Sequence, residues 1–409
     1  MIKDLKDIII TDPTDQDVYK YSMKNFMFCQ NLLRDRVEFC FFNRGKTKFP
    51  KGFAQALQYQ INAFAELKYT TEMIQHIAIT MPWLNPEFVD CYLPTFRYKP
   101  EIVYIEQTPN DNLIIIIDGA WGDVTDWETQ IMAVGSELLN FMNGLEDNPN
   151  IKSKKQRTFD NHIKFSEFNR IGAKVIDYGM RRRYSKDNQS EMLNDFIEFA
   201  PDCLLGTSNL MFAREKNLSP KGTYAHELVQ YMGAKYGPLM ANRELLGKWV
   251  EVYHGALGIA LPDTYTTDVF LKDFDLFYSK LYDGVREDSA PNPIVYQDKM
   301  IKHYEKLNID PKSKQIVHSN GIDSIELVET LINHRKGDIK IGFGIGTWLT
   351  NDIYHINGGM KPVNWVIKMT AAYPFNREKQ YTVKLSDTPG KVTSINPETV
   401  DLYKRILNL

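Results

Sequence analysis

The feature that most constrains the fold is an alternation of short apolar runs with helical segments in the second half of the chain. The runs lie at residues 174–178, 203–206, 222–227, 258–261, 315–318, 340–343 and 363–367. Segments with apolar residues at helical spacing separate most of them, such as Phe270, Phe274, Phe277 and Leu281. Alternating strands and helices are typical of a parallel sheet. The chain therefore predicts either an α/β barrel or a doubly wound sheet.

The first region, residues 1–155, mixes strand and helix patterns without this alternation. Its predicted elements are a helix with Met23, Phe26 and Met27 on one face, a strand at 37–42, a strand pair at 99–107 and 112–118, and a helix at 127–141. A late apolar run at 380–385 can pair back onto this region. We therefore predict a discontinuous α/β domain of residues 1–155 and 372–409, with a barrel domain of residues 156–371.

Charge and hydropathy exclude several classes of function. The 49 basic and 52 acidic residues give a net charge of −3, which favours neither nucleic acid nor an anionic membrane as a partner. The longest apolar run, residues 113–117, is far shorter than the ~20 residues of a membrane span. The N-terminus lacks the apolar core of a signal peptide, so we expect a cytoplasmic protein. Four cysteines without a C-x-x-C pair suggest neither a disulfide framework nor a zinc site.

Polar and aromatic side chains follow the predicted strands. Tyr178 and the triplet Arg181, Arg182 and Arg183 come after the first strand. An aromatic face can stack on a flat ring, and guanidinium groups bind phosphate bidentately. We expect at least one of the arginines to lie in a solvated turn instead.

His226 follows another predicted strand, within the run Gly222-Thr223-Tyr224-Ala225-His226-Glu227. An imidazole at a strand end can act as a general base, a metal ligand or a nucleophile that accepts a phosphoryl group. An ordinary hydrogen-bonded histidine is the alternative.

Acidic side chains occupy two further strand ends. Asp263 can bind ribose hydroxyls there, or cap the helix that follows. Arg286 and Asp288 are two residues apart on a strand, so both side chains can reach one site. A surface salt bridge between them is the alternative.

Two strand-to-turn transitions are rich in small residues, namely 318–323 and 342–347. Their backbone N–H groups could close on phosphate oxygens, although structural glycines are the alternative. The second has Gly-x-Gly-x-Gly-Thr rather than Gly-x-Gly-x-x-Gly and lies late in the chain, which argues against a Rossmann dehydrogenase. Because these motifs come from many different strands, they favour a barrel, which collects all its strand ends at one mouth.

The motifs together resemble the nicotinate phosphoribosyltransferase family over nearly the whole chain. The segments that carry the resemblance are 14–20, 41–44, 165–168, 177–183, 205–209, 220–227, 286–289 and 343–347. Their shared order is far more specific than any one of them. The chain departs from the family pattern at Tyr178, Met180 and 290–293.

The resemblance implies a type II phosphoribosyltransferase with an irregular α/β (TIM-like) barrel, a discontinuous N-terminal α/β domain and a homodimeric assembly. The implied reaction joins nicotinate to phosphoribosyl pyrophosphate, giving nicotinate mononucleotide and pyrophosphate for NAD salvage. ATP hydrolysis would be coupled through phosphorylation of His226. Mg²⁺ would arrive with pyrophosphate, with Asp288 as a candidate ligand.

The resemblance also implies roles for single residues. The neighbouring subunit would supply Tyr19, Lys20 and Arg44, and Tyr19 would stack with Tyr178 on the pyridine ring. The motif at Thr207 and Ser208, with Arg181, would lie near the nicotinate carboxylate. Catalysis would depend on His226, Asp263, Arg286 and Asp288. The 5′-phosphate would bind at Ser319, Asn320, Gly321, Gly344, Gly346 and Thr347.

Two rival functions remain open. A sister enzyme would use nicotinamide or quinolinate, but the neutral hydroxyl of Ser208 favours an acid over an amide substrate. A catalytically inactive homologue would only bind a nucleotide or a partner. The presence of His226, Asp263, Arg286 and Asp288 together argues against it.

Overall fold

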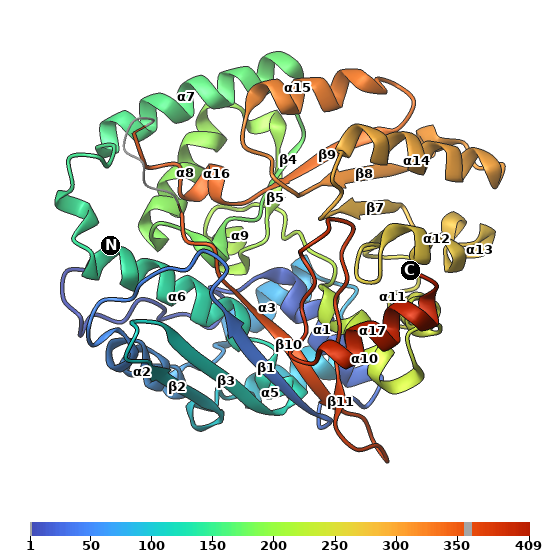
Figure 1. Cartoon of the computed structure of the whole chain (residues 1–409). Helices are drawn as coiled ribbons and strands as arrows, with labels where there is room; N and C mark the ends of the chain where they lie inside the picture. Colours follow the sequence, from blue (N-terminus) through green and yellow to red (C-terminus); the bar gives the residue numbers. More distant parts are fainter. Residues whose placement is uncertain (1, 356–361) are drawn as a thin grey trace.

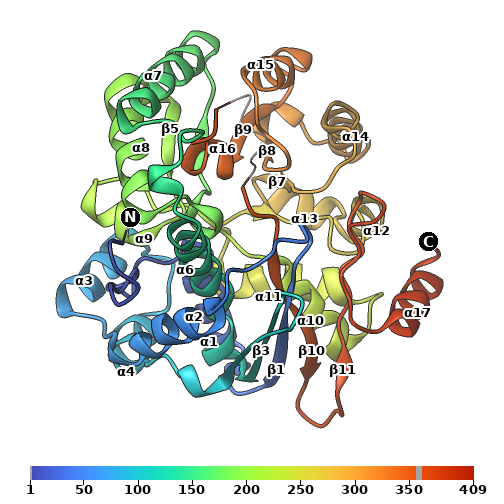
Figure 2. The same ribbon diagram turned by 60° about the vertical axis from the view of Figure 1, so that its left-hand side comes forward.

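The computed structural model describes residues 2–355 and 362–409 of the chain, which build two β-sheets surrounded by helices (Figure 1). One sheet is antiparallel and the other is parallel. The two views in Figures 1 and 2 show the antiparallel sheet at one end of the molecule and the parallel sheet at the other.

The antiparallel sheet has the strand order β11-β10-β1-β3-β2. Its strands are β1 (Arg36–Phe42), β2 (Val103–Gln107), β3 (Leu113–Ala120), β10 (Val366–Tyr373) and β11 (Gln380–Tyr381). The strand at 37–42 and the strand pair are thus confirmed. The late apolar run joins the same sheet through β11, although its partner is β10 and not a strand of the first region. The run at 363–367 was predicted as a strand of the barrel, which is wrong, because it begins β10 beside β1. The predicted boundary at residue 372 therefore falls inside β10.

The parallel sheet has the strand order β5-β4-β9-β8-β7-β6. Its strands are β4 (Val175–Asp177), β5 (Leu204–Thr207), β6 (Ile259–Ala260), β7 (Gly284–Glu287), β8 (Gln315–His318) and β9 (Lys340–Ile345). All neighbours in this sheet run parallel, as the alternation predicts.

An irregular segment, residues 220–225, spans the gap between the edge strands β5 and β6. Pro220 forms a parallel bridge to Thr207 of β5, and the Thr223 hydroxyl donates a hydrogen bond to the carbonyl of Ile259 in β6, at 3.1 Å. The run at 222–227 is therefore not a regular strand, contrary to the prediction. It links the two edges, so the strands follow one another around a ring, as in an irregular barrel.

Helices cover both sheets. The longer ones are α1 (Val18–Cys29), α2 (Phe53–Ala63), α3 (Thr71–Thr80), α6 (Trp127–Met142), α7 (Lys154–Ile171), α8 (Lys186–Phe199), α10 (His226–Tyr236), α11 (Ala241–Tyr253), α14 (Pro293–Lys306), α15 (Ile325–His334) and α17 (Pro397–Leu407). The shorter ones are α4 (Leu93–Thr95), α5 (Trp121–Val124), α9 (Leu210–Glu215), α12 (Thr267–Asp273), α13 (Leu276–Leu281) and α16 (Thr347–Thr350). The predicted helix at 127–141 matches α6.

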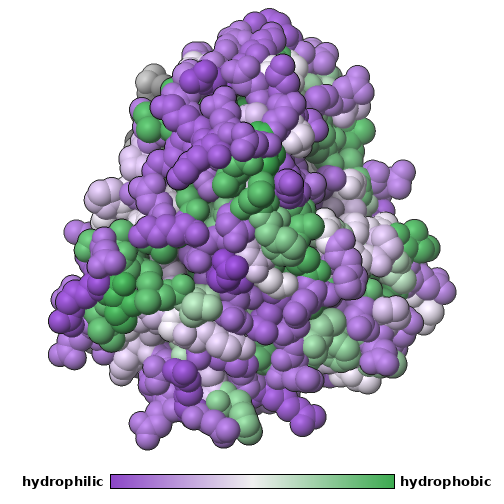
Figure 3. Space-filling view, turned by 90° about the vertical axis from the view of Figure 1, so that its right-hand side faces the viewer, coloured by the Kyte–Doolittle hydropathy of each residue, from purple (hydrophilic) through white to green (hydrophobic). Residues whose placement is uncertain are grey.

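The apolar residues 270–281 form two short helices rather than one continuous face. Phe270 and Phe274 are buried, whereas Phe277 is 61% exposed because α13 begins anew at Leu276. Figure 3 shows the face with α13, α14 and α17, which is mostly hydrophilic with separate hydrophobic patches. Within the described residues, no helix is long and apolar enough to cross a membrane.

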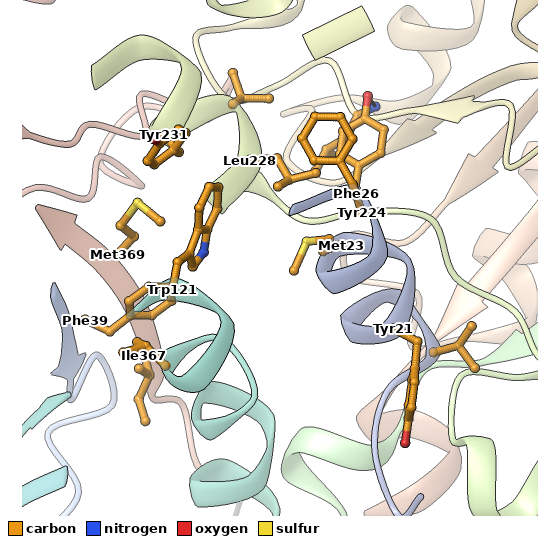
Figure 4. Close-up of a cluster of buried hydrophobic side chains, with 14 of the residues drawn as sticks. Tyr21, Met23, Phe26, Phe39, Trp121, Tyr224, Leu228, Tyr231, Ile367 and Met369 are labelled. Atoms are coloured by element: carbon orange, nitrogen blue, oxygen red, sulfur yellow. Dashed lines mark hydrogen bonds between the residues drawn. The ribbon is translucent and has the colours of Figure 1, made fainter. Parts of the chain in front are cut away.

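One hydrophobic cluster joins the antiparallel sheet to helices from the middle of the chain. Trp121 of α5 stacks on Tyr231 of α10, with ring centroids 4.2 Å apart, and Met369 of β10 lies beside them (Figure 4). Phe39 of β1 pairs with Met369 across the sheet. The core therefore continues across the predicted domain boundary. It holds α10 against β10, which fixes the position of His226 at the start of α10.

Candidate active site

A cavity of about 830 Å³ opens at the carboxyl ends of the parallel strands, where it also meets β1 and β10. Its basic lining residues are Arg44, Arg181, Arg182, Arg286, Lys368, Lys384 and Lys391, and its acidic ones are Asp17 and Asp288. A cavity with this excess of positive charge attracts polyanions.

His226 is the first residue of α10 and is buried at the wall of the cavity. Its Nδ1 lies 2.9 Å from the Thr264 hydroxyl. Its Nε2 lies 3.0 Å from Asp288 Oδ2 and 2.8 Å from Lys384 Nζ. Asp263 lies behind the ring, with Oδ1 3.7 Å from Nε2. The predicted residues His226, Asp263 and Asp288 are thus brought together.

Opposing charges set the ionisation of this cluster. Burial and then the Lys384 ammonium hold the pKa of His226 below its ordinary value, although both aspartates oppose the shift. Burial disfavours the ionised form of Asp263, but Lys384 and His226 hold its pKa below the ordinary value. The site therefore combines a neutral imidazole with ionised carboxylates at neutral pH.

Arg286 and Asp288 both reach the cavity, as their spacing predicts. Arg286 Nη1 donates to Asp288 Oδ1 at 2.9 Å, and the Ser319 hydroxyl donates to the same oxygen at 3.1 Å. Burial opposes ionisation of Asp288, but Arg286 first and then His226 hold its pKa well below the ordinary value. The pair is part of the site rather than a surface salt bridge.

The two predicted stacking tyrosines line the cavity within one chain. Tyr178 follows β4, and Tyr19 lies on α1. Gly344 of β9 makes room for Tyr178, because a Cβ there would lie 2.3 Å from the tyrosine ring. Gly222 packs on Tyr19, whose backbone nitrogen would lie 2.9 Å from a Cβ.

The supply of Tyr19, Lys20 and Arg44 by a neighbouring subunit stays a prediction, although two of these residues already line the cavity of their own chain. Tyr19 and Arg44 line the cavity of their own chain, and Arg44 donates to the Thr393 hydroxyl at 2.7 Å. Lys20 does not line it. Its ammonium is fully buried and contacts Glu128 and Glu227 at 3.0 Å each. Glu227 therefore faces the core, where its carboxylate accepts hydrogen bonds from Lys20 and Trp121.

Ser208 lines the cavity, and its hydroxyl donates to Asp17 Oδ1 at 2.6 Å. Burial raises the pKa of Asp17 to about 6, although Arg181 and Ser208 oppose the shift. Thr207 is buried instead, and it donates to Asp177 Oδ2 at 2.7 Å. Thr207 thus supports the strand end rather than the cavity.

The arginine triplet divides between the cavity and the core. Arg181 and Arg182 line the cavity, where burial and the charges of Arg181 and Arg44 lower the pKa of Arg182 to about 10. Arg183 is fully buried and donates bidentately to Asp15, at 2.8 and 2.7 Å. None of the three is simply a solvated turn, contrary to the prediction.

Only the first of the two predicted phosphate loops lines the cavity. Ser319, Asn320 and Gly321 line the cavity. Gly344, Gly346 and Thr347 are not among its lining residues, and α16, which begins at Thr347, has only four residues. The second loop instead shapes the floor under Tyr178.

Sequence reasoning missed the lysines of the cavity. Lys368 lies on β10 and donates to Glu128 at 2.7 Å, while Lys384 and Lys391 lie on the segment after β11. Lys391 donates to Asn320 Oδ1 at 3.1 Å. The only sequence signal for Lys384 and Lys391 was the apolar run at 380–385, which predicted that this segment returns to an earlier part of the chain.

His226, Asp263 and Asp288 also form a donor set that could hold a metal ion, with their donor atoms within 4.8 Å of one another. Asp263 Oδ1 is buried without a hydrogen-bond partner among the described residues. Two carboxylates suit a hard divalent cation such as Mg²⁺. The donor types therefore suit a cation, although Lys384 Nζ already lies among them, 2.8 Å from His226 Nε2 and 3.4 Å from Asp263 Oδ2.

The parallel α/β sheet and its cationic cavity define the class of protein, an enzyme that binds a polyanionic substrate beside a flat ring. Two family models match the chain, the nicotinate phosphoribosyltransferase family over residues 173–409 and its N-terminal domain over residues 14–136. The chain belongs to the nicotinate phosphoribosyltransferase family. The predicted resemblance is thereby confirmed, and the reaction of the chain is the formation of nicotinate mononucleotide.

Individual relatives agree with the family models. A nicotinate phosphoribosyltransferase of Chromohalobacter salexigens is 37% identical over 97% of each chain. The crystal structure of nicotinate phosphoribosyltransferase from Porphyromonas gingivalis has a TM-score of 0.91 at 34% identity, with 98% of this chain and 100% of that chain covered. The corresponding structure from Vibrio cholerae has a TM-score of 0.88 at 30% identity and covers 98% and 94%.

Proposed function

We propose that this chain couples the formation of nicotinate mononucleotide and pyrophosphate, from nicotinate and phosphoribosyl pyrophosphate, to ATP hydrolysis through a phosphohistidine at His226. The observation that carries the proposal is the buried, neutral His226 imidazole, whose Nε2 lies at a cavity in which basic lining residues outnumber acidic ones. A neutral imidazole has the lone pair that attack on a phosphoryl group requires. A cationic wall stabilises the polyanions on both sides of that transfer.

Nicotinate binds between the two tyrosines in this proposal. Tyr178 and Tyr19 both line the cavity and would stack on the pyridine ring. Arg181 lines the same cavity and would pair with the nicotinate carboxylate. Ser208 also lines this cavity and would lie near the carboxylate.

The phosphorylated substrate binds toward the strand ends of β7 and β8. Ser319, Asn320 and Gly321 would receive the 5′-phosphate, with Lys391 beside Asn320. In this proposal Asp263 would bind the ribose hydroxyls and Asp288 would lie near the pyrophosphate. Arg286 would stabilise the departing pyrophosphate as the C1–oxygen bond breaks and an oxocarbenium-like centre develops.

Mg²⁺ belongs to the proposal as an ion that arrives with pyrophosphate, and not as a resident ion of the donor set described above. Asp288 is its candidate ligand, with Asp263 behind it. When bound, the ion neutralises charge on pyrophosphate. The binding of Arg286 to pyrophosphate does not depend on it.

We also propose a homodimer and a cytoplasmic location, which rest on the family resemblance. Because Tyr19 and Arg44 lie in the cavity of their own chain, the dimer is not needed to supply them. Light scattering after size-exclusion chromatography measures the mass directly. A monomer at micromolar concentration would contradict the dimer.

Incubation with γ-labelled ATP tests the phosphohistidine. We expect acid-labile, base-stable label on the wild type and none on His226→Ala. His303→Gln is a matched control, because His303 is half-buried on α14 and is not among the residues that line the cavity. Absence of label on the wild type would rule out the coupling.

Product formation from nicotinate and phosphoribosyl pyrophosphate, with and without ATP, tests the coupled reaction. We expect nicotinate mononucleotide in both cases and a higher yield with ATP. Equal yields would contradict the coupling but not the transfer itself.

A further inference from the structure

Lys384 lies at the centre of the acidic cluster around His226. Its Nζ is 2.8 Å from His226 Nε2, 3.4 Å from Asp263 Oδ2 and 3.7 Å from Asp288 Oδ2. The side chain is 11% exposed. The residue comes from the segment after β11, which extends from the antiparallel sheet toward the parallel one (Figure 1).

Backbone contacts on both sides hold Lys384 in place. Leu385 donates its N–H to the carbonyl of Thr264 at 2.7 Å, and Lys384 itself pairs with Thr393 in an antiparallel bridge. Val383 and Leu385 are buried in the core. In an extended segment these neighbours face one way and Lys384 faces the other, so the ammonium is directed at His226.

An ammonium group can only donate hydrogen bonds. At 2.8 Å from Nε2 it requires a lone pair on that nitrogen, so the single proton of the neutral ring must lie on Nδ1. The Thr264 hydroxyl, 2.9 Å from Nδ1, can accept that proton's hydrogen bond. Asp288 Oδ2 competes for the same Nε2 at 3.0 Å and would need the opposite tautomer.

We propose that Lys384 is a positioning residue of the active site, which holds His226 in the tautomer with an unprotonated Nε2 and fills the cation position among His226, Asp263 and Asp288. A resident divalent ion bound by the two carboxylates would meet the like charge of the ammonium, whose Nζ lies 3.4 Å from Asp263 Oδ2 and 3.7 Å from Asp288 Oδ2. The chain therefore carries its own cation in this cluster, and Mg²⁺ enters only with the substrate.

This inference rests on the proposed role of His226 as phosphoryl acceptor. In the transfer, the Nε2–phosphorus bond forms while the bond from the γ-phosphorus to the bridging oxygen breaks. The electron pair leaves with ADP. Nε2 carries no proton, so no base must first remove one, and only the hydrogen bond from Lys384 must break as Nε2 attacks. The proton of the ring stays on Nδ1, hydrogen-bonded to the Thr264 hydroxyl.

The tautomer of His226 tests the proposal directly. Nitrogen NMR of ¹⁵N-histidine-labelled protein, with the His226 signal assigned by its loss in His226→Asn, should show Nε2 unprotonated in the wild type. Lys384→Met should move the proton to Nε2, where Asp288 accepts it. Lys384→Arg retains a donor-only cation and should keep the wild-type tautomer. Lys391→Met, on the same segment but bonded to Asn320, is the matched control and should leave the tautomer unchanged.

Zn²⁺ alone probes the cation position, because imidazole and carboxylates suit this ion. Calorimetric titration should show binding to Lys384→Met that is more than about tenfold tighter than to the wild type, since a like charge has been removed. Adding His226→Asn should abolish the gain.

Three results would overturn the proposal: a protonated Nε2 in the wild type, an unchanged tautomer in Lys384→Met, or equal Zn²⁺ affinity of the two proteins. The wild-type tautomer needs no variant, so the proposal stays testable even if Lys384→Met unfolds. Absence of label in the experiment with ATP would instead contradict the proposed phosphohistidine. It would not affect the measurement of the tautomer.

Discussion

Ser208 shows how one side chain can set substrate choice. Its hydroxyl proton is donated to Asp17, so the wall there already carries one acidic group of raised pKa. A second carboxylate at this position would repel an anionic substrate, whereas a neutral hydroxyl does not. We therefore expect the binding of nicotinate through its carboxylate to depend on Ser208 remaining uncharged.

We expect the wild type to turn over nicotinate far faster than nicotinamide. Ser208→Asp should raise KM for nicotinate by at least about tenfold, equivalent to ~1.4 kcal/mol, with a smaller effect for nicotinamide. Steady-state kinetics with both substrates measures the change. Ser208→Asn controls for size, and an equal rise in KM for both substrates would contradict the charge argument.

Arg183 is a residue whose role is structural rather than catalytic. Its bidentate pair with Asp15 is fully buried, whereas the Arg36–Asp118 pair is at the surface with Arg36 57% exposed. Removing one partner of a buried pair leaves an uncompensated charge, but an exposed pair contributes little.

Arg183→Met should lower the free energy of unfolding by ~3–5 kcal/mol. Arg36→Met, the matched control, should lower it by no more than about 1 kcal/mol. Urea unfolding followed by circular dichroism measures both. Similar small losses for the two variants would show that the buried pair contributes no more than the exposed one.

At the scale of elements, β9 illustrates how a glycine in one strand positions a side chain from the next. Gly344 pairs with Ile176 of β4, and a Cβ on it would overlap the Tyr178 ring, at 2.3 Å. Gly342, two residues earlier, would meet only the Lys174 carbonyl at 3.7 Å, an ordinary contact. The two glycines thus separate an effect on the ring from an effect on the strand.

Gly344→Ala should displace Tyr178 and raise KM for nicotinate by about tenfold or more, corresponding to ~1.4 kcal/mol. Gly342→Ala should leave KM near the wild-type value. Kinetics and thermal melting are measured together, so that a loss of fold is recognised. An unchanged KM in Gly344→Ala would show that the ring does not hold nicotinate.

At the scale of the whole molecule, the antiparallel sheet depends on both ends of the chain. β1 lies between β3 and β10, and Trp121 packs on Tyr231 of α10. A fragment of residues 1–155 would expose β1 as an edge and lose the α10 side of the core. The first region is therefore not a unit that buries its own surface.

We expect a fragment of residues 1–155 to remain unfolded or aggregate. The full chain should show near-ultraviolet circular dichroism from its packed aromatic rings, and the fragment should not. Amide spectra of the two proteins give a second measure. A dispersed, folded spectrum of the fragment would contradict the shared core.

Sequence patterns alone determined the local elements, the parallel sheet and most of the site. Hydrophobic periodicity is a local property, so β1, β2, β3 and α6 were predictable, and strand-end motifs named His226, Arg286 and Asp288. Family motifs in a shared order then identified the reaction. The irregular segment at 220–225 was predicted as a strand because it is apolar. Its backbone does not form the regular hydrogen bonds of a strand, and apolar residues alone do not indicate this.

Only the tertiary structure decided which residues share the cavity. It placed Tyr19 and Arg44 at the cavity and buried Lys20 and Arg183 in the core. It also brought Lys384, near the end of the chain, into contact with His226. The physical reason is that side-chain periodicity carries no information about long-range pairing. The contact between Lys384 and His226 depends on β10 pairing with β1 and on β11 pairing with β10, and packing of the common core selects this arrangement.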